Sequence, residues 1–121
     1  MAKVLVADDD PDSLKLLVEI LQDHGHSTVV ARDGAEALDR AALERPEIIL
    51  LDVTMPELNG VEVCSLLKQD RDLQHIPVIL VTARNSAQQM VAGLHAGARD
   101  YITKPFREDV LLGRVRAALR H

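Results

Sequence analysis

The sequence predicts an α/β fold in which helices cover both faces of a doubly wound, five-stranded parallel sheet. Short apolar runs alternate five times along the chain with longer segments whose apolar residues recur at helical spacing. Such an alternation is typical of parallel sheets, because each helix carries the chain back to the start of the next strand. The chain has 121 residues, of which 47% are apolar, so we expect one globular domain spanning residues 1–121.

The five expected strands are the apolar runs. They comprise residues 3–7, 27–31, 48–51, 76–81 and 98–103. The run at 48–51 contains no polar residue, which is typical of a strand that is buried on both faces of a parallel sheet. It stops at Asp52, and Pro56 prevents the strand from continuing. The sequence therefore predicts that Asp52 lies at the C-terminal tip of a buried strand.

The expected helices are bounded by capping residues, glycine and proline. Asp10 is a suitable N-cap for a helix with Pro11 in its first turn, and Gly25 ends this helix. The dipeptide Asn59-Gly60 is a turn signal before the third helix, which ends before Asp72. The other helices are expected over about residues 35–44, 87–96 and 110–119, with Ser86 as the cap of the fourth and Gly97 after its end.

The composition argues against several classes of protein. A formal net charge of -5 argues against contact between this domain and a nucleic-acid backbone. No apolar run approaches the roughly 18 residues of a membrane span, and we see no signal-peptide pattern, so we expect no membrane association. Cys64 is the only cysteine, which excludes an intrachain disulfide and a cysteine metal cluster. A cytoplasmic location fits these observations.

Polar residues of complementary kinds follow four of the predicted strands. They are Asp8 and Asp9, Asp52, Thr82 and Lys104. In a parallel sheet the C-terminal ends of the strands share one edge, and ligands bind there at the point where the strand order reverses. Right-handed crossovers leave few topologies, and we expect the flavodoxin-like order 2-1-3-4-5. This order makes the first and third strands neighbours, so that three carboxylates converge.

Three carboxylates in one crevice repel one another unless a cation joins them. Oxygen ligands without histidine or cysteine favour Mg²⁺, for which Mn²⁺ can substitute. A metal ion, the ammonium group of Lys104 and the hydroxyl of Thr82 are together what a phosphoryl group needs. Because an aspartate carboxylate is a competent nucleophile toward phosphorus, the residues predict that Asp52 accepts a phosphoryl group.

Four stretches of the chain resemble motifs of a known family. They are residues 4–11, residues 51–56 with Asn59 and Gly60 beyond them, residues 81–83 and residues 97–106. In this order and on these elements, they resemble the receiver domain of two-component response regulators, of the bacterial chemotaxis-type single receiver fold. The resemblance covers the whole chain.

The resemblance implies a role for each candidate site residue. Asp52 would be the phosphoacceptor. The implied Mg²⁺ ligands are Asp9 and Asp52 directly, Asp8 through water, and Thr54 through its backbone carbonyl. The implied phosphoryl contacts are Thr82, the backbone of Ala83, and Lys104. The resemblance further implies that Thr82 and Tyr101 move together on activation and that the bond between Lys104 and Pro105 is cis.

By the same resemblance, the domain is a signalling switch that catalyses only its own phosphorylation and dephosphorylation. A histidine kinase or a histidine phosphotransfer protein would supply the phosphoryl group. The face made by the fourth helix, fifth strand and fifth helix would then control a downstream target or effector domain, with a phosphorylation-dependent homodimer as a further option. The cognate kinase, the output, the phosphoryl lifetime and the extent of the full protein stay open.

Two other functions are alternatives. A Mg²⁺-dependent phosphatase with an aspartate nucleophile resembles this site in its sheet edge, metal, lysine and threonine. Such enzymes normally have a second aspartate two positions after the nucleophile, where this chain has Thr54, and they carry a cap insertion that we do not find here. A receiver-like binding module that is never phosphorylated is disfavoured, because every position of the phosphorylation constellation is filled.

Overall fold

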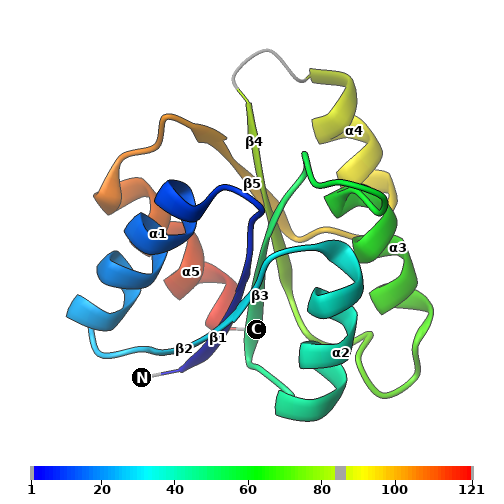
Figure 1. Cartoon of the computed structure of the whole chain (residues 1–121), viewed down its shortest axis with the longest axis horizontal. Coiled ribbons are helices and arrows are strands. Elements are labelled where there is room, and N and C mark those ends of the chain that lie inside the picture. The colour runs from blue at the N-terminus through cyan, green and yellow to red at the C-terminus, as the bar shows by residue number, and fades with distance from the viewer. Residues whose placement is uncertain (1, 84–86, 121) are drawn as a thin grey trace.

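The fold was analysed in a computed structural model that describes residues 2–83 and 87–120. In this part of the chain, five strands alternate with five helices (Figure 1). They are β1 (Lys3–Ala7), α1 (Pro11–Asp23), β2 (Ser27–Ala31), α2 (Gly34–Glu44), β3 (Ile48–Asp52), α3 (Gly60–Gln69), β4 (Val78–Ala83), α4 (Ala87–His95), β5 (Asp100–Lys104) and α5 (Glu108–Leu119). The strands pair in parallel in the order β2-β1-β3-β4-β5, which confirms the predicted doubly wound, flavodoxin-like fold.

The helices form a layer on each face of the sheet. Helices α1 and α5 cover one face, and α2, α3 and α4 cover the other (Figure 1). Strand β3 contributes to both layers, because successive side chains of a strand point to opposite faces. Ile48 and Leu50 pack into the core cluster under α1 and α5, whereas Ile49 and Leu51 pack into the cluster under α2 and α3. The uninterrupted apolar run of β3 is therefore required by burial on both sides.

Local capping explains where the helices adjoining the sheet edge begin. Asp10 is the N-cap of α1, where its carboxylate accepts the N–H of Asp12 at 3.1 Å, as predicted. Asn59, which the sequence suggested only as a turn signal, is the N-cap of α3 and forms a reciprocal capping box with Glu62. The predicted cap of α4, Ser86, lies outside the described residues.

Two strands lie one or two residues later in the sequence than predicted. Strand β4 occupies Val78–Ala83 instead of 76–81, and β5 occupies Asp100–Lys104 instead of 98–103. The parallel ladder continues through Thr82 and Ala83, which face Thr103 and Lys104, because backbone pairing does not depend on side-chain polarity. Helix α3 ends at Gln69 with Asp70 as its C-cap, and so before Asp72, as predicted. Among the described residues, no helix is long and apolar enough to cross a membrane.

Candidate functional site

The charged residues of the site lie at the C-terminal ends of β1, β3 and β5 and share one face of the sheet. Two positions before Asp8, Asp52 and Lys104, the chain has apolar residues of the core cluster under α1 and α5. Because residues two apart along a strand point to the same side, all three charged side chains are directed toward the α1 and α5 face. The alternation of side chains along each strand thus places the two carboxylates and the ammonium group on the same face.

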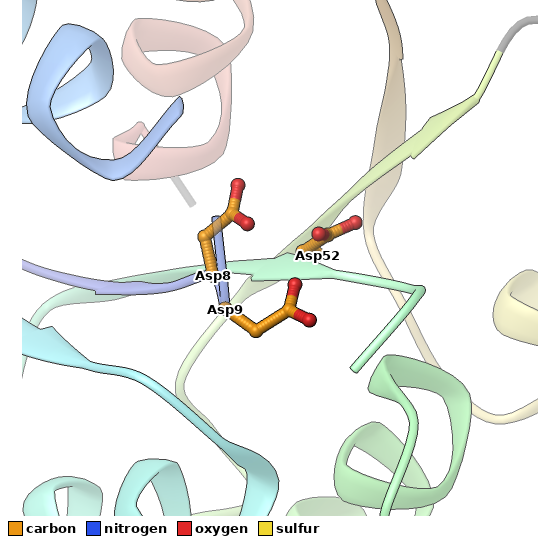
Figure 2. A group of neighbouring side chains, drawn as sticks. All are labelled: Asp8, Asp9 and Asp52. Carbon is orange, nitrogen blue, oxygen red and sulfur yellow. The ribbon is translucent and has the colours of Figure 1, made fainter. Parts of the chain in front are cut away.

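Three carboxylates converge at this edge, as the sequence predicted. Oxygen atoms of Asp8, Asp9 and Asp52 lie within 4.8 Å of one another, and the carboxylates of Asp9 and Asp52 are directed toward the same space (Figure 2). Asp8 and Asp52 are only 1% and 6% exposed, whereas Asp9 is exposed to solvent. The cluster is therefore accessible to solvent at Asp9, while its other two carboxylates are buried.

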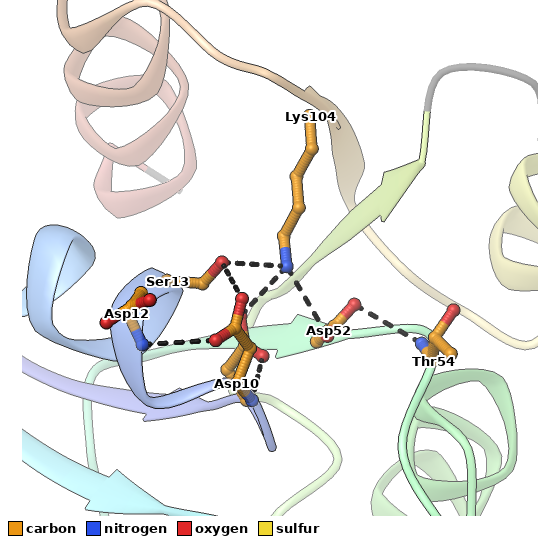
Figure 3. A network of polar contacts seen from close by, with 7 residues as sticks. Asp10, Asp12, Ser13, Asp52, Thr54 and Lys104 are labelled. Atoms are coloured by element: carbon orange, nitrogen blue, oxygen red, sulfur yellow. Dashed lines mark hydrogen bonds and ion pairs between the residues drawn. The ribbon is translucent and has the colours of Figure 1, made fainter.

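Lys104 crosses the crevice and contacts both buried carboxylates. Its Nζ lies 3.1 Å from Asp8 Oδ2 and 3.5 Å from Asp52 Oδ2. It also donates to the hydroxyl of Ser13 on α1 at 3.3 Å (Figure 3). The second oxygen of Asp52 accepts the backbone N–H of Thr54 at 3.2 Å, so both oxygens of Asp52 have a donor.

The electrostatics of the cluster favour a further cation. Burial, followed by the neighbouring Asp8 carboxylate, raises the pKa of Asp52 from 3.8 to about 7, while Lys104 and the Thr54 N–H act in the opposite direction. Burial alone would lower the pKa of Lys104, but the Asp8 and Asp52 carboxylates outweigh it and raise this pKa. One ammonium group thus does not fully compensate for the repulsion between the carboxylates.

The donor set fits a hard divalent metal ion. Asp8, Asp9 and Asp52 offer carboxylate oxygens only, and such ligands suit Mg²⁺ or Mn²⁺ better than softer metals. The solvent-exposed Asp9 leaves room for the water molecules that Mg²⁺ usually retains. The raised pKa of Asp52 is consistent with this fit, because a bound cation would favour the ionised carboxylate.

Thr82 and Tyr101 lie on the opposite face of the sheet from Lys104. Leu80, two positions before Thr82 and paired with Tyr101, belongs to the core cluster under α2 and α3, and Tyr101 packs against this cluster. Thr82 is 1% exposed, and its Oγ1 has no hydrogen-bond partner among the described residues. A buried hydroxyl without a partner is costly and rare, which marks Thr82 as a group that can take a new partner.

One contact of the site was missed by the sequence analysis. Ser13 was not among the predicted site residues, although its hydroxyl contacts Lys104 and donates to Asp10 Oδ2 at 3.1 Å. Its position three residues after the N-cap, on the same helical turn, was the only signal that could have indicated it. The bond between Lys104 and Pro105 is cis, as the resemblance implies.

Comparison with known proteins indicates the family. Residues 4–116 match the response regulator receiver domain family. The response regulator MprA of Mycobacterium avium is 47% identical over 118 residues, which are 98% of this chain and 51% of the relative. MprA of Mycobacterium tuberculosis shows the same identity over 98% of this chain and 50% of its own length. The chain thus spans about half the length of the curated relatives it matches.

Solved structures agree in fold over nearly the whole chain. The chemotaxis protein CheY4 of Vibrio cholerae has a TM-score of 0.92 and 32% identity, covering 98% of this chain and 99% of that one. The signal receiver domain of a signal transduction histidine kinase from Syntrophus aciditrophicus also has a TM-score of 0.92, with 38% identity, covering 99% of this chain and 91% of that one. The same fold therefore makes up nearly the whole of one solved chain and a receiver domain of a histidine kinase.

Proposed function

The chain belongs to the family of response regulator receiver domains, and from this premise we propose that it is a switch activated by phosphorylation of Asp52. Members of this family are signalling modules of two-component systems rather than true enzymes. The single observation that carries the proposal is the position of Asp52. Its carboxylate ends β3 between the Lys104 ammonium and two further carboxylates, with one face of the cluster open to solvent through Asp9.

We further propose how the cluster holds Mg²⁺. Asp9 and Asp52 would ligate the ion directly, Asp8 through water, and Thr54 through its backbone carbonyl; Mn²⁺ could substitute. When bound, the ion would supply positive charge beside the carboxylates and the phosphoryl group. Asp9→Asn is therefore expected to weaken Mg²⁺ binding in an NMR titration, and an unchanged affinity would contradict this ligand assignment.

The chain's own residues supply the remaining parts of the reaction. A carboxylate oxygen of Asp52 attacks phosphorus, so that the bond from phosphorus to the donor histidine nitrogen breaks as the bond to Asp52 forms. Lys104 donates to an oxygen of the phosphoryl group from its place beside Asp52. The hydroxyl of Thr82 and the backbone of Ala83, at the adjacent end of β4, bind the remaining phosphoryl oxygens.

The partners follow from the family and from the exposed face around α4. A histidine kinase is implied as the phosphoryl donor, with a histidine phosphotransfer protein as the alternative. When Thr82 turns toward the phosphoryl group, Tyr101 fills the space behind β4, and the face made by α4, β5 and α5 changes shape. That face then controls an effector domain or target protein, or it forms a phosphorylation-dependent homodimer.

Phosphorylation of Asp52 is tested with a small phosphodonor. Acetyl phosphate with Mg²⁺ is expected to label the parent protein, as measured by intact mass spectrometry, and to leave Asp52→Asn unlabelled. Asp39→Asn, which removes an exposed carboxylate from α2, is the matched control and is expected to be labelled like the parent. Equal labelling of Asp52→Asn and the parent would exclude Asp52 as the acceptor.

Coupling through Thr82 is tested separately. Beryllium fluoride bound at Asp52 is expected to shift the NMR signals of α4 and β5 in the parent, and Thr82→Ala is expected to reduce these shifts while still accepting a phosphoryl group. Thr28→Ala on β2, far from the site, is the control for loss of a strand hydroxyl. Shifts in Thr82→Ala as large as those of the parent would contradict this coupling and leave the acceptor assignment intact.

A further inference from the structure

We propose that Ser13 is a positioning residue that holds the ammonium group of Lys104 beside Asp52. This inference rests on the proposed function, because it concerns the lysine that binds the phosphoryl group. Ser13 lies in the first turn of α1 and is half-buried, while Lys104 ends β5, so the contact joins two elements at opposite ends of the chain (Figure 3).

The contacts of Lys104 account for all of its hydrogen-bond donors. An ammonium group has three N–H donors. Lys104 Nζ has three acceptors within reach, at 3.1 Å for Asp8, 3.3 Å for Ser13 and 3.5 Å for Asp52. The side chain is only 27% exposed, so each acceptor replaces a water molecule that the ammonium group would otherwise bind. Ser13 is therefore one of three groups that define where the charge lies.

The hydroxyl of Ser13 is itself held in one orientation. It donates its hydrogen to Asp10 Oδ2 at 3.1 Å, which leaves its lone pairs directed at Lys104. Asp10 is fixed in turn as the N-cap of α1, where its other oxygen accepts the N–H of Asp12. A hydrogen-bonded chain thus runs from the backbone of α1 through Asp10 and Ser13 to Lys104.

Ser13 differs from the other two acceptors in chemistry. Asp8 and Asp52 are carboxylates that also face the divalent cation, and Asp52 changes its charge and shape when it carries a phosphoryl group. The Ser13 hydroxyl is neutral, and it neither faces the divalent cation nor carries the phosphoryl group. When the carboxylates engage the cation and the phosphoryl group, Ser13 still holds one N–H of Lys104, and the other two can turn toward the phosphoryl oxygens. Loss of this anchor weakens capture of the phosphoryl group without removing any metal ligand.

The test compares Ser13→Ala with Ser13→Thr, which restores a hydroxyl at the same position. Ser65→Ala is the matched control, because Ser65 is also a helical serine whose hydroxyl accepts one side-chain hydrogen bond, from Gln69 on α3. Beryllium fluoride affinity is measured by NMR titration at saturating Mg²⁺, and Mg²⁺ affinity is measured alone. Because the contact is long, at 3.3 Å, loss of a hydrogen bond of ordinary strength predicts roughly three- to tenfold weaker beryllium fluoride binding in Ser13→Ala.

The expected affinities distinguish a positioning role of Ser13 from a merely structural one. Ser13→Ala weakens beryllium fluoride binding and leaves Mg²⁺ affinity unchanged, Ser13→Thr restores binding toward the parent value, and Ser65→Ala changes neither. Unchanged beryllium fluoride affinity in Ser13→Ala overturns the inference. So does an equal loss of both affinities with no recovery in Ser13→Thr, since that marks a merely structural role for the first turn of α1. Labelling of Asp52 in the parent is checked first, and its failure would overturn the proposed function as well.

Discussion

The two faces of the sheet edge differ in how far their buried polar groups are paired by hydrogen bonds. On the face under α1 and α5, Lys104, Asp8, Asp52 and Ser13 form a connected network in which the ammonium group has a partner for every donor. On the face under α2, α3 and α4, the Thr82 hydroxyl is buried and has no partner among the described residues. The network face thus holds paired charges, whereas the Thr82 hydroxyl has no hydrogen bond within residues 2–83 and 87–120 and can bind a new partner.

Helix α4, on the Thr82 face, packs less tightly than the other helices. Helices α1 and α5 each bury several apolar residues against the sheet, whereas Gly93 is the one buried residue that α4 has within its described span. On the outer side of α4, Val91 and Leu94 are 57% and 45% exposed. A helix with so little buried surface is held weakly, so small changes beneath it can move it. The proposed signal therefore passes from the network under α1 and α5 to the weakly packed helix α4.

The largest expected effect concerns the repulsion within the network. Without divalent cation, Asp52→Asn is expected to raise the free energy of unfolding at pH 8, by at most about 4 kcal/mol, which corresponds to the rise in the pKa of Asp52 from 3.8 to about 7. Because the pKa of Asp52 is higher in the folded state, the folded parent binds more protons than the unfolded chain at pH values between the two pKa values. Stability of the parent should thus fall as pH rises from about 4 to about 7.

Urea unfolding at several pH values measures this effect, with Asp39→Asn as the control for removal of an exposed carboxylate. The control is expected to follow the parent curve, and Asp52→Asn is expected to be flatter over the same range. A loss of stability in Asp52→Asn at pH 8 would mean that the network is not strained by its charges, and the contrast between the two faces would disappear.

A second, smaller effect concerns the cation of the network. Lys104→Met without divalent cation is expected to lower the free energy of unfolding by about 3 kcal/mol at pH 8, because Asp8 and Asp52 then lie buried with no compensating charge. The matched control is Arg114→Met. Its pair with Asp100 has a 3.0 Å contact but side chains that are 44% and 29% exposed, so the expected loss is below about 1 kcal/mol. Equal losses in chemical denaturation would show that Lys104 behaves as a surface charge.

The smallest effect tests the other face. Thr82→Val replaces a buried hydroxyl, which has no partner in the described part of the chain, with a methyl group of similar shape. It is expected to raise the free energy of unfolding by about 1 kcal/mol. Thr103→Val, on the paired position of β5, is the comparison variant. Thermal unfolding monitored by circular dichroism measures both. A clear loss of stability in Thr82→Val would show that its hydroxyl has a partner in the resting state.

Much of the site could be read from local patterns in the sequence. The unbroken apolar run of β3 indicated burial on both faces, and the polar residues after the strands indicated one shared edge. These predictions are sound because strand alternation and the common direction of parallel strands are general geometric rules. The same rules explain why the convergence of three carboxylates was predicted, and local capping chemistry explains why Asp10 was. The ends of β4 and β5 depend on ladder pairing and were misplaced by one or two residues.

The properties that distinguish the two faces depend on contacts across the fold. Ser13 and Lys104 are separated by 91 positions, and their contact exists only because the core cluster under α1 and α5 seats the first turn of α1 over the end of β5. The burial that raises the pKa of Asp52 and isolates the Thr82 hydroxyl likewise arises from packing by distant segments. The sequence by itself determined which groups gather at the sheet edge. Only the tertiary structure decided which of them are paired, because pairing depends on distances that packing sets.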